Sequence, residues 1–180
     1  TNIYYRAFSD CSGLMSVTIS DCVLKQGFRS VFGSSNSITN VVILDGVTDI
    51  GYRAFSDCSD LTSVTIPNSV TNIYYRAFSD CSGLMSVTIS DCVLKQGFRS
   101  VFGSSNSITN VVVLDGVTNI SNLAFSGCSG LTSVTIPNSV TNISNSAFSG
   151  CSGLTGVTIP DSVTTIGDHA FSGCSGLTNV

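Results

Sequence analysis

One dipeptide position returns along the whole chain at a nearly constant spacing. The 180-residue sequence carries an Ala-Phe pair, or Val-Phe in its place, at eight evenly spaced points. A fixed period of this length, about 23 residues, is typical of a solenoid, in which each repeat forms one coil and stacks on the next. The period therefore constrains the fold more than any local preference does. The marker pairs are Ala7-Phe8, Val31-Phe32, Ala54-Phe55, Ala77-Phe78, Val101-Phe102, Ala124-Phe125, Ala147-Phe148 and Ala170-Phe171.

A second period lies over the first. Residues 1–42 recur without change as residues 71–112, and the offset between the two copies equals three successive repeats. This copying predicts a single array over residues 1–180. Neither end of the sequence shows a polar, atypical repeat of the kind that caps a solenoid. We therefore expect the array to be uncapped at both ends and to be part of a longer chain.

Residues 54–76 illustrate the expected path of one coil. Val64 and Ile66 alternate with Ser63 and Thr65, which predicts a short strand with its apolar side facing inward. A Pro-Asn-Ser turn follows, and residues 70–73 then return as a second extended piece. Residues 54–58 read as one helical or 3₁₀ turn. Because one coil cannot bury its own apolar side chains, stacking predicts a continuous core and a parallel sheet on one face.

Segments 20–43 and 90–113 depart from this pattern, and each holds one extra residue. We expect a local bulge in each, with Phe28 and Phe98 filling the core site that Ile73 fills in a regular coil. Their cysteines, Cys22 and Cys92, are expected on a turn.

Composition limits the classes of function. Only 10% of the residues are charged, with seven Lys or Arg against eleven acidic residues, all Asp, and a net charge of −4. Nucleic-acid binding is not expected, because it needs clustered positive charge. The longest apolar runs are about four residues, well below the ~20 of a membrane-spanning helix. With one histidine, His169, and no Glu, the chain has almost no acid–base repertoire, so we expect neither an enzyme nor a cofactor.

Eight cysteines raise the question of disulfides or metal. Six of them occupy one phase of the repeat, which favours small, buried apolar side chains with free thiols. Disulfides between adjacent coils and metal binding are the alternatives; the first suits parallel side-chain directions poorly, and the second lacks a Cys-x-x-Cys pair. The six are Cys11, Cys58, Cys81, Cys128, Cys151 and Cys174.

Two surfaces are candidates for binding a partner. The first, called the sheet face below, consists of the outward residues of the predicted strands, although small polar ladders equally suit strand packing. The second, the Tyr/Arg row, precedes the marker pair and holds residue types that interfaces favour, although Tyr can also lie over the solenoid edge as packing. The sheet face comprises Ser16, Thr18, Asn40, Val42, Ser63, Thr65, Ser86, Thr88, Asn110, Val112, Ser133, Thr135 and Thr158. The Tyr/Arg row comprises Tyr5, Arg6, Tyr52, Arg53, Tyr75 and Arg76.

Residues 131–151 carry a family resemblance. Their apolar, Pro, Ala-Phe and Cys positions are similar to the repeat pattern of the BspA-like leucine-rich repeat, and six of about eight coils follow it closely. The two divergent segments replace its Pro, Ala and Cys by Ser, Val and Ser. The matching positions in this stretch are Leu131, Val134, Ile136, Pro137, Val140, Ile143, Ala147, Phe148 and Cys151.

The resemblance implies a leucine-rich-repeat solenoid, an arc of about eight coils with a parallel β-sheet on one face and short extended segments and helical turns elsewhere. It also implies a secreted or cell-surface module that binds proteins and mediates adhesion. The partner would be a host matrix protein or a protein of a neighbouring cell, with a glycan as the alternative. A structural spacer or fibre-forming array, with no specific ligand site, is the competing hypothesis.

Overall fold

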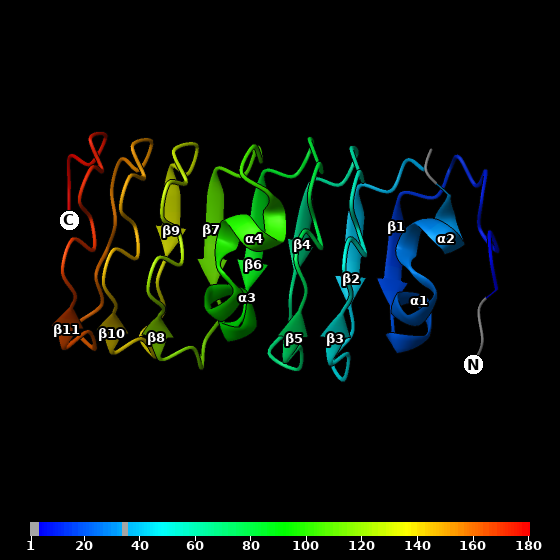
Figure 1. Cartoon of the computed structure of the whole chain (residues 1–180). Coiled ribbons are helices and arrows are strands. Elements are labelled where there is room, and N and C mark those ends of the chain that lie inside the picture. The colour runs from blue at the N-terminus through cyan, green and yellow to red at the C-terminus, as the bar shows by residue number, and fades with distance from the viewer. Residues whose placement is uncertain (1–3, 34–35) are drawn as a thin grey trace.

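Successive coils stack side by side in the computed structural model, which describes residues 4–33 and 36–180. One strand from each of several coils joins a six-stranded parallel sheet in the order β1-β2-β4-β6-β7-β9 (Figure 1). This arrangement confirms the predicted solenoid and its sheet. The strands are β1 (Ser16–Ile19), β2 (Asn40–Ile43), β4 (Ser63–Thr65), β6 (Ser86–Ile89), β7 (Asn110–Val113) and β9 (Ser133–Thr135).

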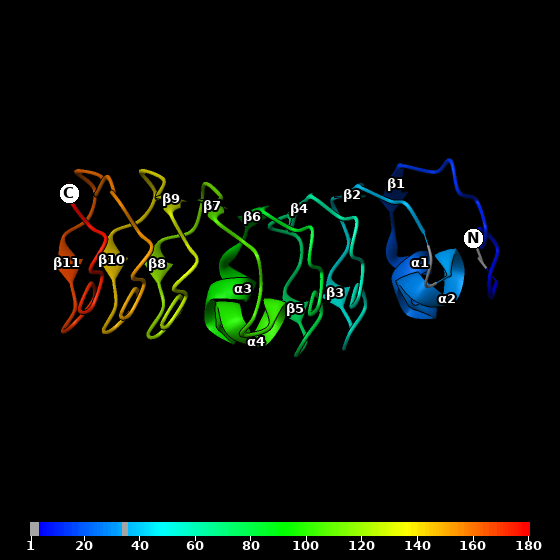
Figure 2. The ribbon, with the colours of Figure 1, turned by 90° about the horizontal axis from the view of Figure 1, so that it is seen from above.

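Shorter strands lie on the other side of the coils. One pair and one three-stranded ladder, both parallel, are separated by a helical coil (Figure 2). They correspond to the predicted return segment, for which residues 72–73 are the example. These strands are β3 (Asp49–Ile50), β5 (Asn72–Ile73), β8 (Asn119–Ile120), β10 (Asn142–Ile143) and β11 (Thr165–Ile166).

The alternation of side chains explains why the main strands form. Val64 and Ile66 are buried, whereas Ser63 and Thr65 are exposed, as the period of two predicts. The register places Val64 beside Val41 and Val87 in the neighbouring strands, so each inward row is continuous from coil to coil.

Helices replace the expected bulges in the two divergent segments. Residues 21–32 form α1 (Asp21–Gln26) and α2 (Phe28–Phe32), and residues 91–102 form α3 (Asp91–Gln96) and α4 (Phe98–Phe102). The bulge prediction was therefore wrong. Leu, Lys and Gln are good helix formers, and Gly97, at φ 88°, supplies the left-handed residue that separates α3 from α4. Figure 2 shows both helix pairs on the side opposite the six-stranded sheet.

Two further expectations for these segments were also wrong. Phe28 and Phe98 do not fill the isoleucine site, because their rings contact phenylalanine rings: Phe98 lies 4.6 Å from Phe102 and 5.3 Å from Phe125. Cys92 lies in α3 and is buried rather than on a turn. The side chain of its copy, Cys22, lies outside the described residues.

A column of phenylalanine rings runs through the core. Phe55 and Phe78 stack with ring centroids 4.7 Å apart and planes 4° apart, and Phe125 and Phe148 stack at 5.0 Å. Phe28 continues the column at 4.9 Å from Phe55. Such offset contacts between rings add to the free energy gained by burying each ring. The phenylalanine of each Ala-Phe marker therefore recurs in the sequence because it belongs to this phenylalanine column.

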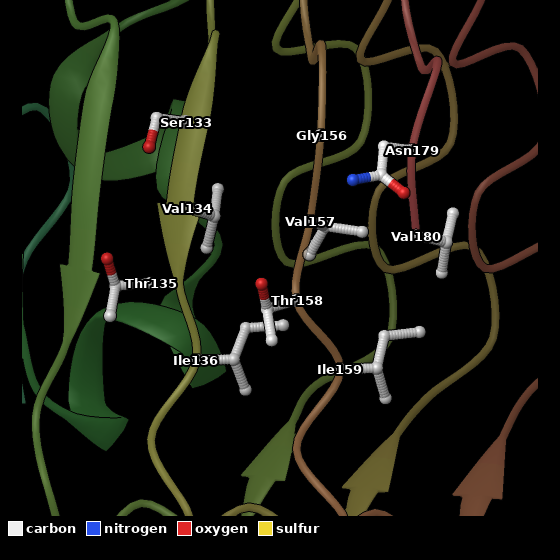
Figure 3. A pocket seen from close by; sticks show the side chains of 10 residues that line it. All are labelled: Ser133, Val134, Thr135, Ile136, Gly156, Val157, Thr158, Ile159, Asn179 and Val180. Atoms are coloured by element: carbon white, nitrogen blue, oxygen red, sulfur yellow. The ribbon is translucent and has the colours of Figure 1, made fainter.

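The six-stranded sheet ends at β9. The next coil, residues 156–159, forms no strand and makes only an isolated bridge between Gly156 and Asn179. A cavity of about 770 Å³ lies there, between β9 and the last two coils (Figure 3). Gly156 stands where the other strands carry Ser or Asn, and a glycine weakens a strand because it is costly to order and offers no side chain to pack. Thr158 is exposed but lies outside the sheet that was expected to hold it.

We predict that Phe78→Ala lowers the free energy of unfolding by about 3–5 kcal/mol, because it removes a fully buried ring between two others. Phe78 is 1% exposed and contacts Phe55 and Phe102. Urea unfolding followed by circular dichroism measures the change. Tyr52→Ala, at a residue that is 62% exposed, is the matched control and should shift stability by about 0.5 kcal/mol or less. Equal losses in both variants would contradict the phenylalanine column as a source of stability.

Candidate functional site

The sheet face forms two rows of side chains in register. Ser63 lies beside Asn40 and Ser86, and Thr65 lies beside Val42 and Thr88. The rows continue in register to β9 at Ser133 and Thr135. The structure therefore brings together the predicted sheet-face residues from β1 to β9, and Thr158 is the one that lies outside these strands.

Hydrogen bonds connect neighbouring coils across this face. The Asn40 side-chain amide donates to the Ser16 hydroxyl at 3.1 Å, and the identical pair recurs between Asn110 and Ser86. The face carries no charged side chain, and Val42 is 44% exposed on it. Neutral hydroxyl and amide groups can donate and accept hydrogen bonds but provide no long-range attraction, so this surface suits close, extended contact.

A threonine ladder runs beside the strands, and the sequence reasoning did not identify it. The hydroxyl of Thr62 donates to the carbonyl of Thr39 in the preceding coil at 3.1 Å, and Thr132 does the same to Thr109 at 3.0 Å. A similar ladder accompanies the short strands, where Thr141 donates to Thr118 at 3.3 Å. The signal was present as threonine at one fixed position of most repeats, with Met15 and Met85 in its place in two of them. Much of the polar composition therefore holds coils together.

The Tyr/Arg row is exposed to solvent. Tyr5, Tyr52 and Tyr75 are 75%, 62% and 49% exposed. Two of the arginines lie near the ring of the tyrosine that precedes them: the Arg53 guanidinium is 5.9 Å from the Tyr52 centroid, and that of Arg76 is 5.2 Å from the Tyr75 centroid. These cation–π contacts place aromatic and charged groups side by side on adjacent coils.

The three arginines of this row share an uncommon backbone conformation. Arg6, Arg53 and Arg76 have φ between 54° and 57°, in the left-handed region that non-glycine residues rarely adopt. His169, at the same position of another repeat, has the same conformation. The conformation is therefore a feature of the repeat and does not identify a binding site. Backbone hydrogen bonds between coils stabilise this conformation. For example, the Arg76 amide donates to the carbonyl of Ser100 at 2.7 Å.

Two of the arginine side chains in this region form ion pairs. Arg6 lies 3.9 Å from Asp10, and Arg29, in the intervening coil, lies 2.5 Å from Asp57. All four side chains are substantially exposed, so each pair contributes little to stability. Their effect is to neutralise positive charge at this end of the row.

The in-phase cysteines are free thiols, and all of them except Cys11 are buried. Cys81 and Cys151 donate from Sγ to the carbonyls of Phe55 and Phe125 in the preceding coil, each at 3.1 Å. The prediction of small, buried thiols is confirmed for those five and is wrong for the exposed Cys11. The sequence reasoning did not identify the thiol as a hydrogen-bond donor to the backbone.

Burial also controls the chemistry of these thiols. It raises the pKa of Cys128 and of Cys151 to about 12, because a thiolate is poorly solvated inside the core. Buried thiols of this kind are weak nucleophiles at neutral pH.

Within residues 4–33 and 36–180, no group of three or more His, Cys, Asp or Glu side chains could hold a metal ion. His169 is exposed. No helix in the described part of the chain is both long and apolar enough to cross a membrane.

The parallel sheet on one face, the short strands and helices opposite and the phenylalanine column between them define a leucine-rich-repeat solenoid. Comparison with protein families matches residues 1–98 and 97–180 to the BspA type leucine-rich repeat region, in six copies. The chain belongs to the BspA type leucine-rich repeat family. A search of the curated proteins finds no match.

Solved structures of bacterial leucine-rich-repeat proteins resemble the chain. A leucine-rich repeat protein from Eubacterium ventriosum is 26% identical with a TM-score of 0.61, and the match covers 88% of this chain and 42% of that one. A leucine rich cell surface protein from Faecalibacterium prausnitzii is 33% identical with a TM-score of 0.51, over 91% of this chain and 41% of that one. This chain therefore spans about two fifths of the length of each.

We predict that the protein loses stability as the pH rises above 9. An unfolded thiol titrates near its ordinary pKa of 9.0, whereas the folded thiols of Cys128 and Cys151 titrate near 12. The unfolded state therefore binds fewer protons in this window, so the stabilisation is fully present below pH 9 and is lost between pH 9 and 12.

Melting temperatures measured by circular dichroism at pH 8 and at pH 10.5 test this. The variant Cys128→Ala with Cys151→Ala should show a smaller drop between the two pH values than the parent protein. Cys11→Ser, which changes an exposed thiol, is the control and should leave the drop unchanged. The prediction fails when all three proteins show the same pH dependence.

Proposed function

We propose that this chain is a protein-binding and adhesion module of a secreted or cell-surface protein, and that it binds through the sheet face. The partner would be a host matrix protein or a surface protein of a neighbouring cell, with a glycan as the alternative. We further propose that it is no enzyme, since its polar groups are mainly hydroxyls and amides. Membership of the BspA type family and the likeness to a cell surface protein support the proposed location.

The observation that carries this proposal is the registered sheet face. Hydroxyl, amide and small apolar groups repeat in step with the strands over the whole six-stranded sheet. The short Ser, Thr and Val side chains of this registered array have little conformational entropy to lose, and that favours extended contact with a partner. Its neutral character is matched to a partner surface that is neutral and polar.

A structural array without a ligand is the second candidate. It is favoured by the hydrogen bonds that sheet-face amides and hydroxyls already make to one another, such as Asn110 to Ser86. It is also favoured by the lack of aromatic and Arg side chains among the sheet-face residues, because those types supply most binding hot spots. The Tyr/Arg row would then be the remaining surface with hot-spot chemistry.

Surface plasmon resonance over a panel of matrix and plasma proteins tests these alternatives. One variant carries Thr65→Arg, Thr88→Arg and Thr135→Arg on the sheet face. A second variant carries Tyr52→Ser, Tyr74→Ser and Tyr75→Ser in and beside the Tyr/Arg row. We expect the first variant to bind at least about tenfold more weakly, because it places unpaired charge in a neutral interface, and the second to bind unchanged.

Circular dichroism spectra of both variants serve as the folding control. Loss of binding in the tyrosine variant alone would move the interface to the Tyr/Arg row. Absence of saturable binding to every protein of the panel, with both variants folded, would favour the structural array.

A further inference from the structure

Two equivalent cavities lie three coils apart, beside the Tyr/Arg row. The first, of about 330 Å³, is lined by Tyr5, Arg6, Arg29, Ser30 and Gly33. The second, of about 290 Å³, is lined by the identical copies of these residues, Tyr75, Arg76, Arg99, Ser100 and Gly103, together with Ser104. Each cavity therefore brings two arginines from adjacent coils to one tyrosine.

The two cavities differ in charge. In the first, both arginines are paired with carboxylates, Arg6 with Asp10 and Arg29 with Asp57. In the second, neither Arg76 nor Arg99 forms an ion pair with any described residue. Asp80 lines an adjoining cavity together with Arg76 and is the acidic group on that side. The second cavity therefore has two arginines against one aspartate, and the first has two against two.

A single substitution removes the acidic partner of Arg99, whereas Asp80 keeps the place beside Arg76 that Asp10 has beside Arg6. The position that holds Asp57 in the first copy holds Gly127 in the second, because the identical blocks end at residues 42 and 112. Both residues have left-handed φ, 60° for Asp57 and 71° for Gly127. A Cβ atom built on Gly127 would lie 2.7 Å from Nη1 of Arg99, so the Arg99 guanidinium lies directly over this glycine. The Arg99 guanidinium lies on the side of Gly127 where, at the equivalent position, the Asp57 carboxylate pairs with Arg29.

We propose that Arg76, Arg99 and Tyr75 form a binding site for the carboxylate or sulfate group of an anionic sugar. Guanidinium groups bind such oxyanions through paired N–H donors in a fixed fork. Ser100, Ser104 and Tyr75 line the same cavity, and their hydroxyls would bind the hydroxyls of a sugar ring. The cavity is slightly smaller than the pockets that hold drug-sized ligands, about 300–1,000 Å³, and this fits one monosaccharide unit.

Hydroxyl donors around the arginines favour a sugar over an acidic side chain of a protein partner, since a lone carboxylate would leave those donors unused. In the adjoining cavity, the buried hydroxyl of Ser79 also has no hydrogen-bond partner among the described residues. The site is independent of the adhesion proposed for the sheet face, and it can exist whether or not that face binds a protein.

Titration with methyl glucuronide, followed by nuclear magnetic resonance of the arginine Nε–Hε groups at constant ionic strength, tests the proposal. We expect saturable shifts of Arg76 and Arg99 and no saturable shift of Arg6 or Arg29. Methyl glucoside, which lacks the carboxylate, and acetate, which lacks the sugar ring, should each bind at least about tenfold more weakly. Acetate binding as tightly as methyl glucuronide would show that only the oxyanion is recognised and would overturn the sugar assignment.

A reciprocal exchange of the distinguishing residue is the matched control. Gly127→Asp should pair with Arg99 as Asp57 pairs with Arg29, and it should weaken glucuronide binding at least about tenfold. Asp57→Gly should release Arg29 and create a second site, raising the stoichiometry from one to two. Arg99→Gln removes the charge directly, in case Gly127→Asp disturbs the fold. Equal binding by the parent protein, Gly127→Asp and Arg99→Gln would overturn the proposal, as would the absence of any shift at Arg76 and Arg99.

Discussion

Stacking of one coil on the next is the constraint on which the rest of the structure depends. A single coil is too short to enclose its own apolar side chains, so every inward group must be covered by its copy in the adjacent coils. The phenylalanine column meets this requirement most directly, because a planar ring can contact one ring before it and one after it. Phe78, between Phe55 and Phe102, is an example. The repeat length is therefore held nearly constant by the need to keep each ring opposite the next.

The polar side chains follow the same constraint. Thr62 and Thr132 donate to carbonyls of the preceding coil, and Asn40 reaches Ser16 in the same way. Hydroxyl and amide groups suit this task because each can donate to an oxygen of the preceding coil, whereas stacked like charges repel each other. The low charge of the chain is thus a consequence of stacking. It also leaves the sheet face neutral, and this limits the partners that the face can hold.

The sequence predicted the elements that repeat, because a periodic pattern averages out local ambiguity. The sheet, its inward valines and the buried in-phase cysteines followed from position within the period. The divergent segments escape a prediction made from the period, because the local helix preference of residues 21–32 and 91–102 outweighs their place in the repeat. Cys11 and the break after β9 could not be predicted either, since burial and pairing depend on neighbouring coils as well as on the residue itself.

The Tyr/Arg row shows the same dependence in its charges. Arg29 and Arg99 lie in identical segments, yet one is paired and the other is not, because the deciding residue belongs to a later coil. In a solenoid, residues far apart in the sequence, such as Arg29 and Asp57, are direct neighbours, and no short motif contains both. Duplication of a block therefore copies the cavity but not its environment. A substitution outside the copied block, Asp57 against Gly127, is enough to give two identical sets of arginines different electrostatic surroundings, and so different capacities to bind an anion.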